Sequence, residues 1–183
     1  MTIFTRMCTS LDGYVTTPDG WPVQLAFDGW DAGALGFYDL QARCDSVLMG
    51  RVTFEPALNA PHWPWGDRPV FVLGGHRPGG TPEHVVFEAE PARLLERLRE
   101  AQTDSSSGDV HLVGGPRTIE TMRTLGALDE IRLMVLPIFT GNGRRLTPGF
   151  DSSTQLELRA VRQWPAGVVE LVYGIRTTNG NSE

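Results

Sequence analysis

The chain has 183 residues, 40% of them hydrophobic and 21% charged, with a formal net charge of -6. This length and composition predict one globular domain with its own core, and the acidic balance argues against a nucleic-acid surface, which normally carries a basic excess. No apolar run approaches the ~20 residues that cross a bilayer, and the first residues lack a signal-peptide pattern, so we expect a cytoplasmic protein with no membrane partner.

Strands and helices alternate through the first part of the predicted fold. We expect strands over residues 3–8, 46–49, 70–73 and 85–87, and helices over residues 31–43, 53–58 and 91–102. The last of these helices starts at Pro91 and repeats Leu94, Leu95 and Leu98 on one face, which is typical of an amphipathic helix. Pro18-Asp19-Gly20 predicts a turn in the loop that follows the first strand.

The second part adds further strands and ends in a hairpin. We expect a strand over residues 110–113 and a helix over 117–125, closed by Gly126 in a left-handed conformation. Residues 131–136 form a near-continuous apolar run, which favours a strand covered on both faces. Two alternating segments, 156–164 and 168–175, flank Pro165-Ala166-Gly167 and predict an antiparallel hairpin. The sequence therefore indicates an α/β fold with a mixed sheet.

Two strand ends carry the same polar pattern. Val47-Leu48-Met49 leads into Gly50, Arg51 and Thr53, and Val110-His111-Leu112-Val113 leads into Gly114, Gly115, Arg117 and Thr118. Glycine lets a ligand approach the backbone, and helix starts with arginine and threonine favour anions. Either junction alone is compatible with a simple turn, whereas the two together indicate one anionic ligand between neighbouring strand ends.

These landmarks, in this order, resemble the dihydrofolate reductase-like superfamily, in the branch with the reductase domain of bacterial riboflavin biosynthesis. The resemblance rests on Ser10-Leu11-Asp12-Gly13, on the Gly-Arg-x-Thr box at residues 50–53, on Gly114-Gly115-Pro116, and on the late strand and loop over 128–146. It implies a three-layer α/β fold, with a mostly parallel central sheet, flanking helices and a C-terminal antiparallel hairpin. We expect one domain over residues 1–178 and a disordered tail over 179–183.

The resemblance also implies NADPH as the cofactor. Gly50, Arg51 and Thr53 are expected to meet the adenine-side phosphates, and the pyrophosphate is expected at Gly114, Gly115, Arg117 and Thr118. The nicotinamide is expected near residues 7–15, where Gly13 and Val15 are the candidate contacts. At the third strand exit, Gly74 and Gly75 replace the hydroxyl residues that dihydrofolate reductases commonly use for the ribose 2′-phosphate. His76 and Arg77 follow; Arg77 either pairs with this phosphate, which favours NADPH over NADH, or is a solvated turn residue.

The resemblance assigns no residue of this chain as the proton donor. Dihydrofolate reductases carry an acid in the first helix, but the corresponding positions near Ala34 and Leu35 hold none. Asp31 is the nearest candidate for the catalytic acid, with Asp28 and Asp39 as weaker ones, and the other role of Asp31 is a helix N-cap.

The resemblance favours an NADPH-dependent reductase that transfers hydride to a carbonyl or imine of a pyrimidine- or pteridine-type substrate, similar to 5-amino-6-(5-phosphoribosylamino)uracil reductase. A non-catalytic NADPH-binding sensor and a dihydrofolate reductase-type enzyme are the alternatives. The family also implies a homodimer, and the alternating apolar residues of 156–175 give the sheet a second face to cover.

The remaining candidates have structural readings. Trp21, Trp30, Trp63 and Trp65 either stack on a planar substrate or pack within their loops. The four histidines show no metal-ligand spacing, His111 is expected to be half-buried in its strand, and we expect no metal. Cys8 and Cys44 form no CxxC pair and are expected to be buried reduced thiols.

Overall fold

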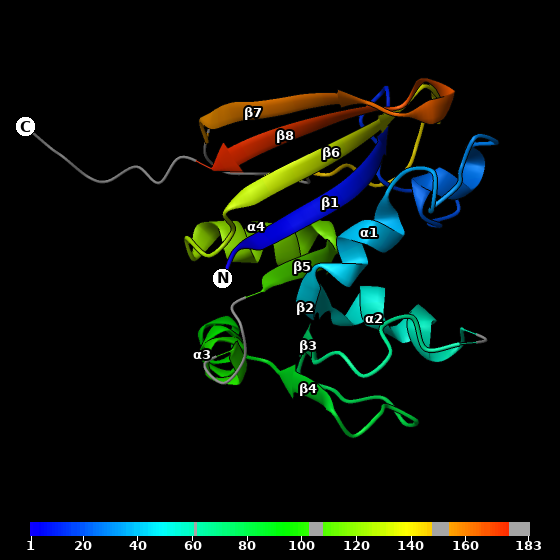
Figure 1. Ribbon diagram of the computed structural model, residues 1–183. Coiled ribbons are helices and arrows are strands. Elements are labelled where there is room, and N and C mark those ends of the chain that lie inside the picture. Colours follow the sequence, from blue (N-terminus) through cyan, green and yellow to red (C-terminus); the bar gives the residue numbers. More distant parts are fainter. Residues whose placement is uncertain (61, 103–107, 148–153, 176–183) are drawn as a thin grey trace, which may run out of the picture.

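The computed structural model describes residues 1–60, 62–102, 108–147 and 154–175 (Figure 1). Within them, eight strands form one sheet in the order β4-β3-β2-β5-β1-β6-β8-β7. The strands are β1 (Ile3–Ser10), β2 (Cys44–Gly50), β3 (Val70–Leu73), β4 (Val85–Glu88), β5 (Asp109–Gly114), β6 (Glu130–Leu136), β7 (Leu156–Gln163) and β8 (Val169–Ile175). Neighbours from β4 to β6 pair in parallel, and β8 pairs antiparallel with β6 and β7. The predicted fold class is confirmed.

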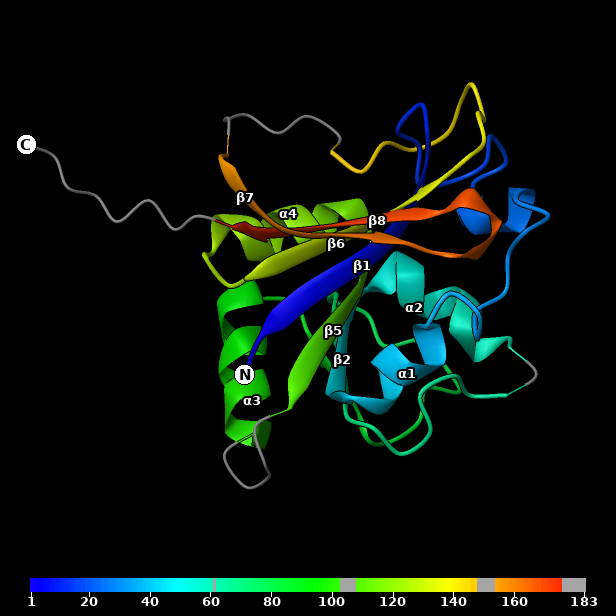
Figure 2. The same ribbon diagram turned by 45° about the horizontal axis from the view of Figure 1, so that its top comes forward.

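Helices cover both faces of the parallel part of the sheet (Figures 1 and 2). They are α1 (Phe37–Ala42), α2 (Arg51–Leu58), α3 (Pro91–Gln102) and α4 (Pro116–Thr124), with short 3-10 turns η1 (Val23–Ala26) and η2 (Pro165–Gly167). Phe54 of α2 packs with Val47 and Met49 of β2, whereas α3 and α4 pack with Leu48 between them. Successive strand residues point to opposite faces, so α2 lies on one face and α3 and α4 on the other.

Helices α3 and α4 form where the sequence predicts them. Leu94, Leu95 and Leu98 of α3 are buried on one stripe. Helix α4 ends at Thr124 and Gly126 closes it. The φ of Gly126, +63°, is left-handed, and its N–H donates to the carbonyl of Arg123 at 2.9 Å. This closing turn confirms the predicted role of Gly126.

The predicted helix over residues 31–43 is wrong in its first half, because α1 begins only at Phe37. The Asp31 carboxylate accepts the N–H groups of Gly33 and Ala34 at 2.8 and 2.9 Å, which fixes a turn instead. Gly36 follows with a φ of +68°, and a Cβ there would lie 2.6 Å from the Trp164 ring. Only glycine fits this position, and its left-handed conformation separates the turn from the helix.

The prediction that residues 131–136 are covered on both faces is correct only in part, because only Ile131 of the second face packs against the core beside α4. Glu130, Met134 and Leu136 are buried, but Ile131, Leu133 and Val135 are only half-buried. The same alternation continues across the hairpin, because cross-strand neighbours share a face. We call this side of β6, β8 and β7 the uncharged face; it consists of Ile131, Leu133, Val135, Leu156, Leu158, Val161, Gln163, Val169, Leu171, Tyr173 and Ile175.

A buried ion pair crosses the opposite side of these strands. The Arg6 Nε donates to Glu170 Oε1 at 2.8 Å, and both side chains are at most 2% exposed. Arg6 Nη2 donates to the carbonyl of Leu35 at 2.8 Å, while Arg162 and Trp164 donate to the second Glu170 oxygen. Burial lowers the pKa of Arg6, against the opposing effect of Glu170. The pair therefore fastens the segment before α1 to the sheet.

Several smaller expectations can be compared with the structure. Cys8 and Cys44 are buried free thiols, as predicted, and burial raises their pKa to about 12 and about 11. No helix in the described ranges is long and apolar enough to cross a bilayer. The predicted domain end at residue 178 and the tail over 179–183 lie outside the described residues.

Candidate cofactor and active site

The sheet opens between its two central strands, β5 and β1. These strands pair only at Ile3–Val110 and Phe4–His111, whereas β1 stays paired with β6 from Phe4 to Ser10. The carboxyl ends of β5 and β1 therefore splay apart at the edge where all the parallel strands end. Ligand crevices of open α/β sheets form at this edge, outside the strand ends.

The two predicted glycine junctions meet at this opening. Gly50 precedes α2 and Gly115 precedes α4, and neither helix start has a side-chain cap. A Cβ on Gly50 would lie 2.4 Å from the Thr118 Oγ1, so the start of α4 packs directly on the end of β2. Two sets of first-turn N–H groups thus face one edge, and the helix dipoles make this edge attractive to an anion.

The hydroxyls and glycines of both junctions form the floor of this edge. Thr53 Oγ1 would lie 3.4 Å from a Cβ on Gly115, and Met7 of β1 approaches Gly114 from across the opening. Gly114 has a φ of +140°, a conformation that other residues rarely adopt. Gly114 and Gly115 therefore place no side chain of their own between the backbone and a bound phosphate.

Two arginines flank the floor. Arg51 is 44% exposed, forms an ion pair with Glu55 one turn later, and carries its stem across Gly74 at the end of β3. Arg117 is exposed at the first turn of α4. Both residues are exposed, so their guanidinium groups can add positive charge beside an anion bound at the junctions.

The structure favours the turn reading of Arg77. Its Nη1 donates to the carbonyl of Val85 at 2.8 Å, and its Nη2 donates to the carbonyl of Pro82 at 2.8 Å. Its guanidinium thus holds the loop between β3 and β4, while His76 is exposed beside it. The guanidinium N–H groups that would donate to a 2′-phosphate therefore already donate to backbone carbonyls of this chain.

A loop over residues 138–145 holds the segment that follows β1. The Asp12 carboxylate accepts the N–H groups of Gly141 and Thr140 at 2.8 and 3.3 Å, and hydrogen bonds from Ser10 and these backbone groups lower the pKa of Asp12. Gly13 has a φ of +86°, and buried Val15 donates its N–H to the carbonyl of Arg144 at 2.8 Å. The predicted nicotinamide segment is therefore held by residues 138–145.

Arg145 is a residue of this region to which the sequence assigned no role. Its guanidinium lies 4.6 Å from the centre of the Tyr14 ring and 3.5 Å from a Cβ built on Gly13. The sequence feature that could have drawn attention to Arg145 is the glycine-rich segment Gly141-Asn142-Gly143 just before it. That segment predicts a tight turn but not which strand end the following arginine reaches.

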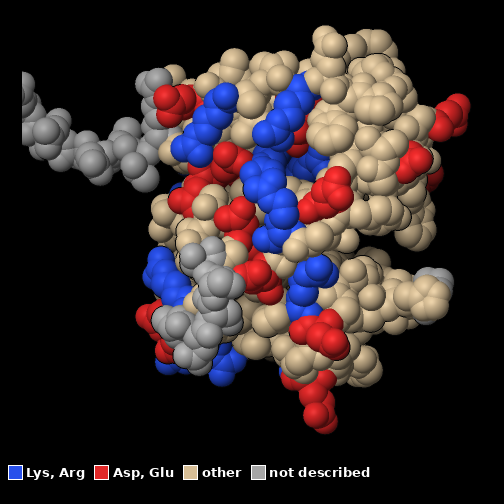
Figure 3. Space-filling model, in the orientation of Figure 1, with Lys and Arg blue, Asp and Glu red and all other residues tan. Residues whose placement is uncertain are grey.

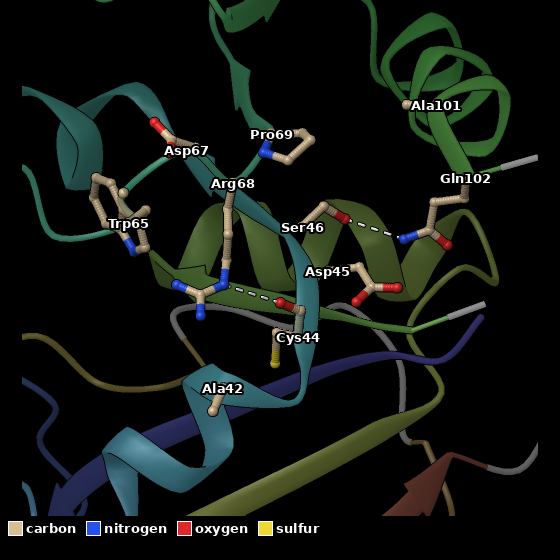
Figure 4. A pocket seen from close by; sticks show the side chains of 11 residues that line it. Ala42, Cys44, Asp45, Ser46, Trp65, Asp67, Arg68, Pro69, Ala101 and Gln102 are labelled. Atoms are coloured by element: carbon tan, nitrogen blue, oxygen red, sulfur yellow. Dashed lines mark hydrogen bonds between the residues drawn. The ribbon is translucent and has the colours of Figure 1, made fainter. Parts of the chain in front are cut away.

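A groove of about 300 Å³ lies beside the 138–145 loop, lined by Thr9, Ser10, Gly13, Leu133, Val135 and Arg145 among others. A larger cavity of about 580 Å³ lies at the opposite edge, between the start of β2, the segment before β3 and the end of α3 (Figure 4). There Arg68 donates to the carbonyl of Cys44 and Gln102 donates to Ser46. Because parallel strands begin at that edge, the larger cavity is separate from the glycine junctions.

Asp31 caps a backbone turn, and three of the four candidate tryptophans pack on neighbouring rings. Asp31 is exposed in the turn before α1, where its Oδ1 accepts two backbone N–H groups. Trp63 and Trp65 pack edge to face at 4.9 Å within the core around Phe54, and Trp30 packs on Phe37. Trp21 is 61% exposed. Of the two readings that the sequence left open, packing within the loops holds at Trp63 and Trp65.

His111 is more deeply buried than predicted. It is 7% exposed, stacks on Phe4 at 5.3 Å, and burial lowers its pKa to about 4. The imidazole is thus neutral near pH 7 and belongs to the core. Across the described ranges, no group of three or more His, Cys, Asp or Glu side chains is placed to hold a metal ion.

Comparison with known proteins assigns the family. The sequence model of the RibD C-terminal domain matches residues 1–170. The chain belongs to this family. It is 28% identical over 165 residues to YwjB of Bacillus subtilis (strain 168), a protein of uncharacterized function, and the match covers 88% of this chain and 91% of YwjB.

Solved structures show the same fold. A Shewanella sp. PV-4 protein, provisionally assigned to riboflavin biosynthesis, superposes with a TM-score of 0.78 at 24% identity over 97% of this chain and all (100%) of that one. The Thermotoga maritima diaminohydroxyphosphoribosylaminopyrimidine deaminase/5-amino-6-(5-phosphoribosylamino)uracil reductase superposes with a TM-score of 0.71 at 13% identity. That match covers 96% of this chain and 56% of the Thermotoga chain. At these identities the likeness establishes the fold.

Proposed function

We propose that the protein is an NADPH-dependent reductase. It transfers hydride to a carbonyl or imine carbon of a pyrimidine- or pteridine-type heterocycle, a reaction similar to that of 5-amino-6-(5-phosphoribosylamino)uracil reductase. The observation that carries this proposal is the meeting of two uncapped helix starts at the splayed ends of β1 and β5. Membership of the RibD C-terminal domain family supports the reductase class.

The residues at this edge fit the phosphates of a dinucleotide. First-turn N–H groups of α2 and α4 supply directed donors, Thr53 and Thr118 supply hydroxyls, and Gly114 leaves room for close approach. Arg51 and Arg117, which are exposed, add positive charge. When bound, NADPH supplies the hydride. This chain holds the cofactor, and its glycines leave the backbone open to the phosphates.

Substrate is proposed to bind beside the Gly13–Val15 segment. The Asp12 hydrogen bonds and the buried Val15 fix this segment, so it offers a rigid wall against which two reactants are aligned. The proton comes from Asp31 or from water. The cap position of Asp31 favours water, because its carboxylate already serves two backbone donors.

The expected compartment is the cytoplasm, and the expected assembly is a homodimer. The two free, buried thiols fit a reducing compartment. The family resemblance supports the homodimer.

The test is a calorimetric titration with NADPH, followed by an assay of NADPH oxidation with a panel of pyrimidine and pteridine carbonyls. We expect one binding site per chain and turnover with at least one heterocycle. Binding without turnover across the panel favours the sensor alternative. Turnover of dihydrofolate itself identifies a dihydrofolate reductase-type enzyme, and failure to bind NADPH contradicts the proposal as a whole.

A further inference from the structure

The cavity at the edge where the parallel strands begin is large enough for a small molecule. Its volume of about 580 Å³ lies within the range of ligand pockets, about 300–1,000 Å³. Ala42, Trp65 and Pro69 form apolar parts of its wall. Figure 4 shows a polar side chain on either side of it, Arg68 on one side and Gln102 on the other. The cavity can therefore contact a ligand at two polar ends.

Arg68 forms the first polar end. Its Nε donates to the carbonyl of Cys44 at 3.1 Å, and this hydrogen bond anchors the side chain on the start of β2. Within the described ranges, the two Nη groups of Arg68 have no hydrogen-bond or ion-pair partner. An anchored guanidinium with both Nη groups unpaired is suited to hold a carboxylate through two parallel hydrogen bonds.

Gln102, the last residue of α3, forms the second polar end. Its Nε2 donates to the Ser46 Oγ at 3.1 Å, whereas its Oε1 is buried and accepts no hydrogen bond from the described residues. Buried amide oxygens in folded proteins are almost always paired, because an unpaired one has lost the hydrogen bonds that water gave it. A donor from outside the chain is therefore expected at this oxygen.

A bulge in β2 brings Asp45 to the same end. Cys44 and Ser46 pair with adjacent residues of β5, so Asp45 between them is the extra residue of the bulge, and bulges redirect side chains. The Asp45 Oδ2 accepts the N–H of Gly108 at 2.7 Å, and in the described part of the chain the Oδ1 has no partner. Figure 4 shows this carboxylate beside the Gln102 amide. Two unpaired acceptors, one of them charged, fit an ammonium group.

The charges of the lining distinguish between classes of ligand. Arg68 contributes one positive charge, and Asp45 and Asp67 contribute two negative ones. A polyanion would be repelled by both carboxylates, and a simple cation would be repelled by the guanidinium. Across the face of the molecule seen in Figure 3, acidic and basic side chains are likewise interleaved rather than gathered by sign. A ligand with one charge of each sign matches this arrangement.

We propose that this cavity binds a short zwitterion with the dimensions of a dipeptide. Its carboxylate pairs with the Nη groups of Arg68, and its ammonium group donates to Gln102 Oε1 and to Asp45. The two charges of an α-amino acid share one carbon, whereas two extended residues span about 7 Å and can reach both sides of the cavity. No residue of the glycine junctions takes part, so the inference does not rest on the proposed function.

Calorimetric titration of the native protein with glycylglycine gives the first test. We expect saturable binding at one site per chain. N-acetylglycylglycine lacks the ammonium charge and glycylglycinamide lacks the carboxylate, so each should bind at least about tenfold more weakly, and free glycine should also bind more weakly. No saturation by glycylglycine up to about 10 mM, well above a millimolar dissociation constant, overturns the proposal. Equal binding of the blocked forms or of glycine overturns it as well.

Two variants test whether the ligand lies in this cavity. Arg68→Met removes the guanidinium but keeps an unbranched side chain, and it should weaken glycylglycine binding at least about tenfold. Arg43→Met is the matched control, because Arg43 is exposed nearby and does not line the cavity. Asp45→Asn keeps an oxygen for the Gly108 N–H but loses the charge, and it should also weaken binding.

Thermal denaturation establishes that each variant is folded, and the comparison of blocked ligands needs no variant at all. Unchanged affinity in Arg68→Met, or an equal loss in Arg43→Met, overturns the assignment to this cavity. None of these measurements involves NADPH, so failure here is distinct from failure of the proposed function.

Discussion

Polar groups have opposite surroundings at the carboxyl edge of the sheet and in its interior. At the edge, the first turns of α2 and α4 have no side-chain caps, and Arg51 and Arg117 are exposed. In the interior, Arg6 and Glu170 are paired and both oxygens of Glu170 accept hydrogen bonds. Groups whose partners are built into the fold stabilise it, whereas uncapped donors are available to a ligand.

The comparison predicts the largest loss of stability at Glu170. Glu170→Ala leaves Arg6 buried without its counter-charge, which is expected to lower the free energy of unfolding by about 3–5 kcal/mol. Urea denaturation measures this loss. The double variant Arg6→Met/Glu170→Leu removes both charges and is expected to recover most of it. A change below about 1 kcal/mol in Glu170→Ala contradicts a structural role for the pair.

The buried His111 makes the stability of the interior depend on pH. Burial lowers its pKa to about 4 from 6.5, so below the higher value the unfolded chain binds a proton that the folded chain does not. The stabilisation is present above pH 6.5 and is lost as pH falls toward 4, by up to about 3 kcal/mol. Denaturation curves across this range measure it. His111→Phe keeps an aromatic ring beside Phe4, and its free energy of unfolding should fall less between pH 6.5 and 4 than that of the native protein. An equal fall in both proteins argues against His111 as the cause.

At the edge, Arg51→Ala should weaken NADPH binding without a matching loss of stability. We expect about 1.5–3 kcal/mol, the range for a charge-assisted hydrogen bond. Glu55→Gln is the matched control, since it removes the Arg51 ion pair and leaves the guanidinium in place. Calorimetry that finds unchanged affinity in Arg51→Ala removes this residue from the site.

Asp31 shares features of both kinds of polar group: it is exposed, like the groups available to a ligand, but its Oδ1 accepts hydrogen bonds within the fold. Asp31→Asn keeps the turn, since an amide oxygen also accepts backbone N–H groups. If Asp31 is the acid, turnover should fall by at least about tenfold while NADPH affinity stays unchanged. Steady-state kinetics with a heterocycle that the enzyme reduces provide the readout. Full activity assigns proton delivery to solvent.

Arg77 gives the smallest expected effect. Its guanidinium is bound to carbonyls of its own loop, so Arg77→Ala should change the affinities for NADPH and NADH equally. A loss confined to NADPH would show that the side chain leaves the loop to bind the 2′-phosphate, and would move Arg77 into the class of available groups.

Local signals predicted much of this molecule. Pro91 and Gly126 mark a helix start and a helix end through backbone geometry that depends on few neighbours. The same logic misplaced the start of α1, because Asp31 caps a turn as readily as a helix and the Gly36 conformation depends on distant Trp164. Contacts between residues far apart in the chain decide such cases.

The candidate site shows the same limit. The pattern of glycine, arginine and threonine predicted both junctions, and the parallel strand order explains why they meet. The splay between β5 and β1, the position of Arg145 and the carbonyl partners of Arg77 depend on tertiary packing. An apolar run such as residues 131–136 likewise does not reveal whether its second face is covered within one chain.

A crystal structure with NADPH tests the central claim most directly. The account predicts the pyrophosphate against Gly114, Gly115 and Thr118, the adenine-side phosphates at Gly50–Thr53, and the nicotinamide at the opening between β5 and β1. Cofactor bound elsewhere, for instance in the cavity at the opposite edge beside Arg68, would contradict it.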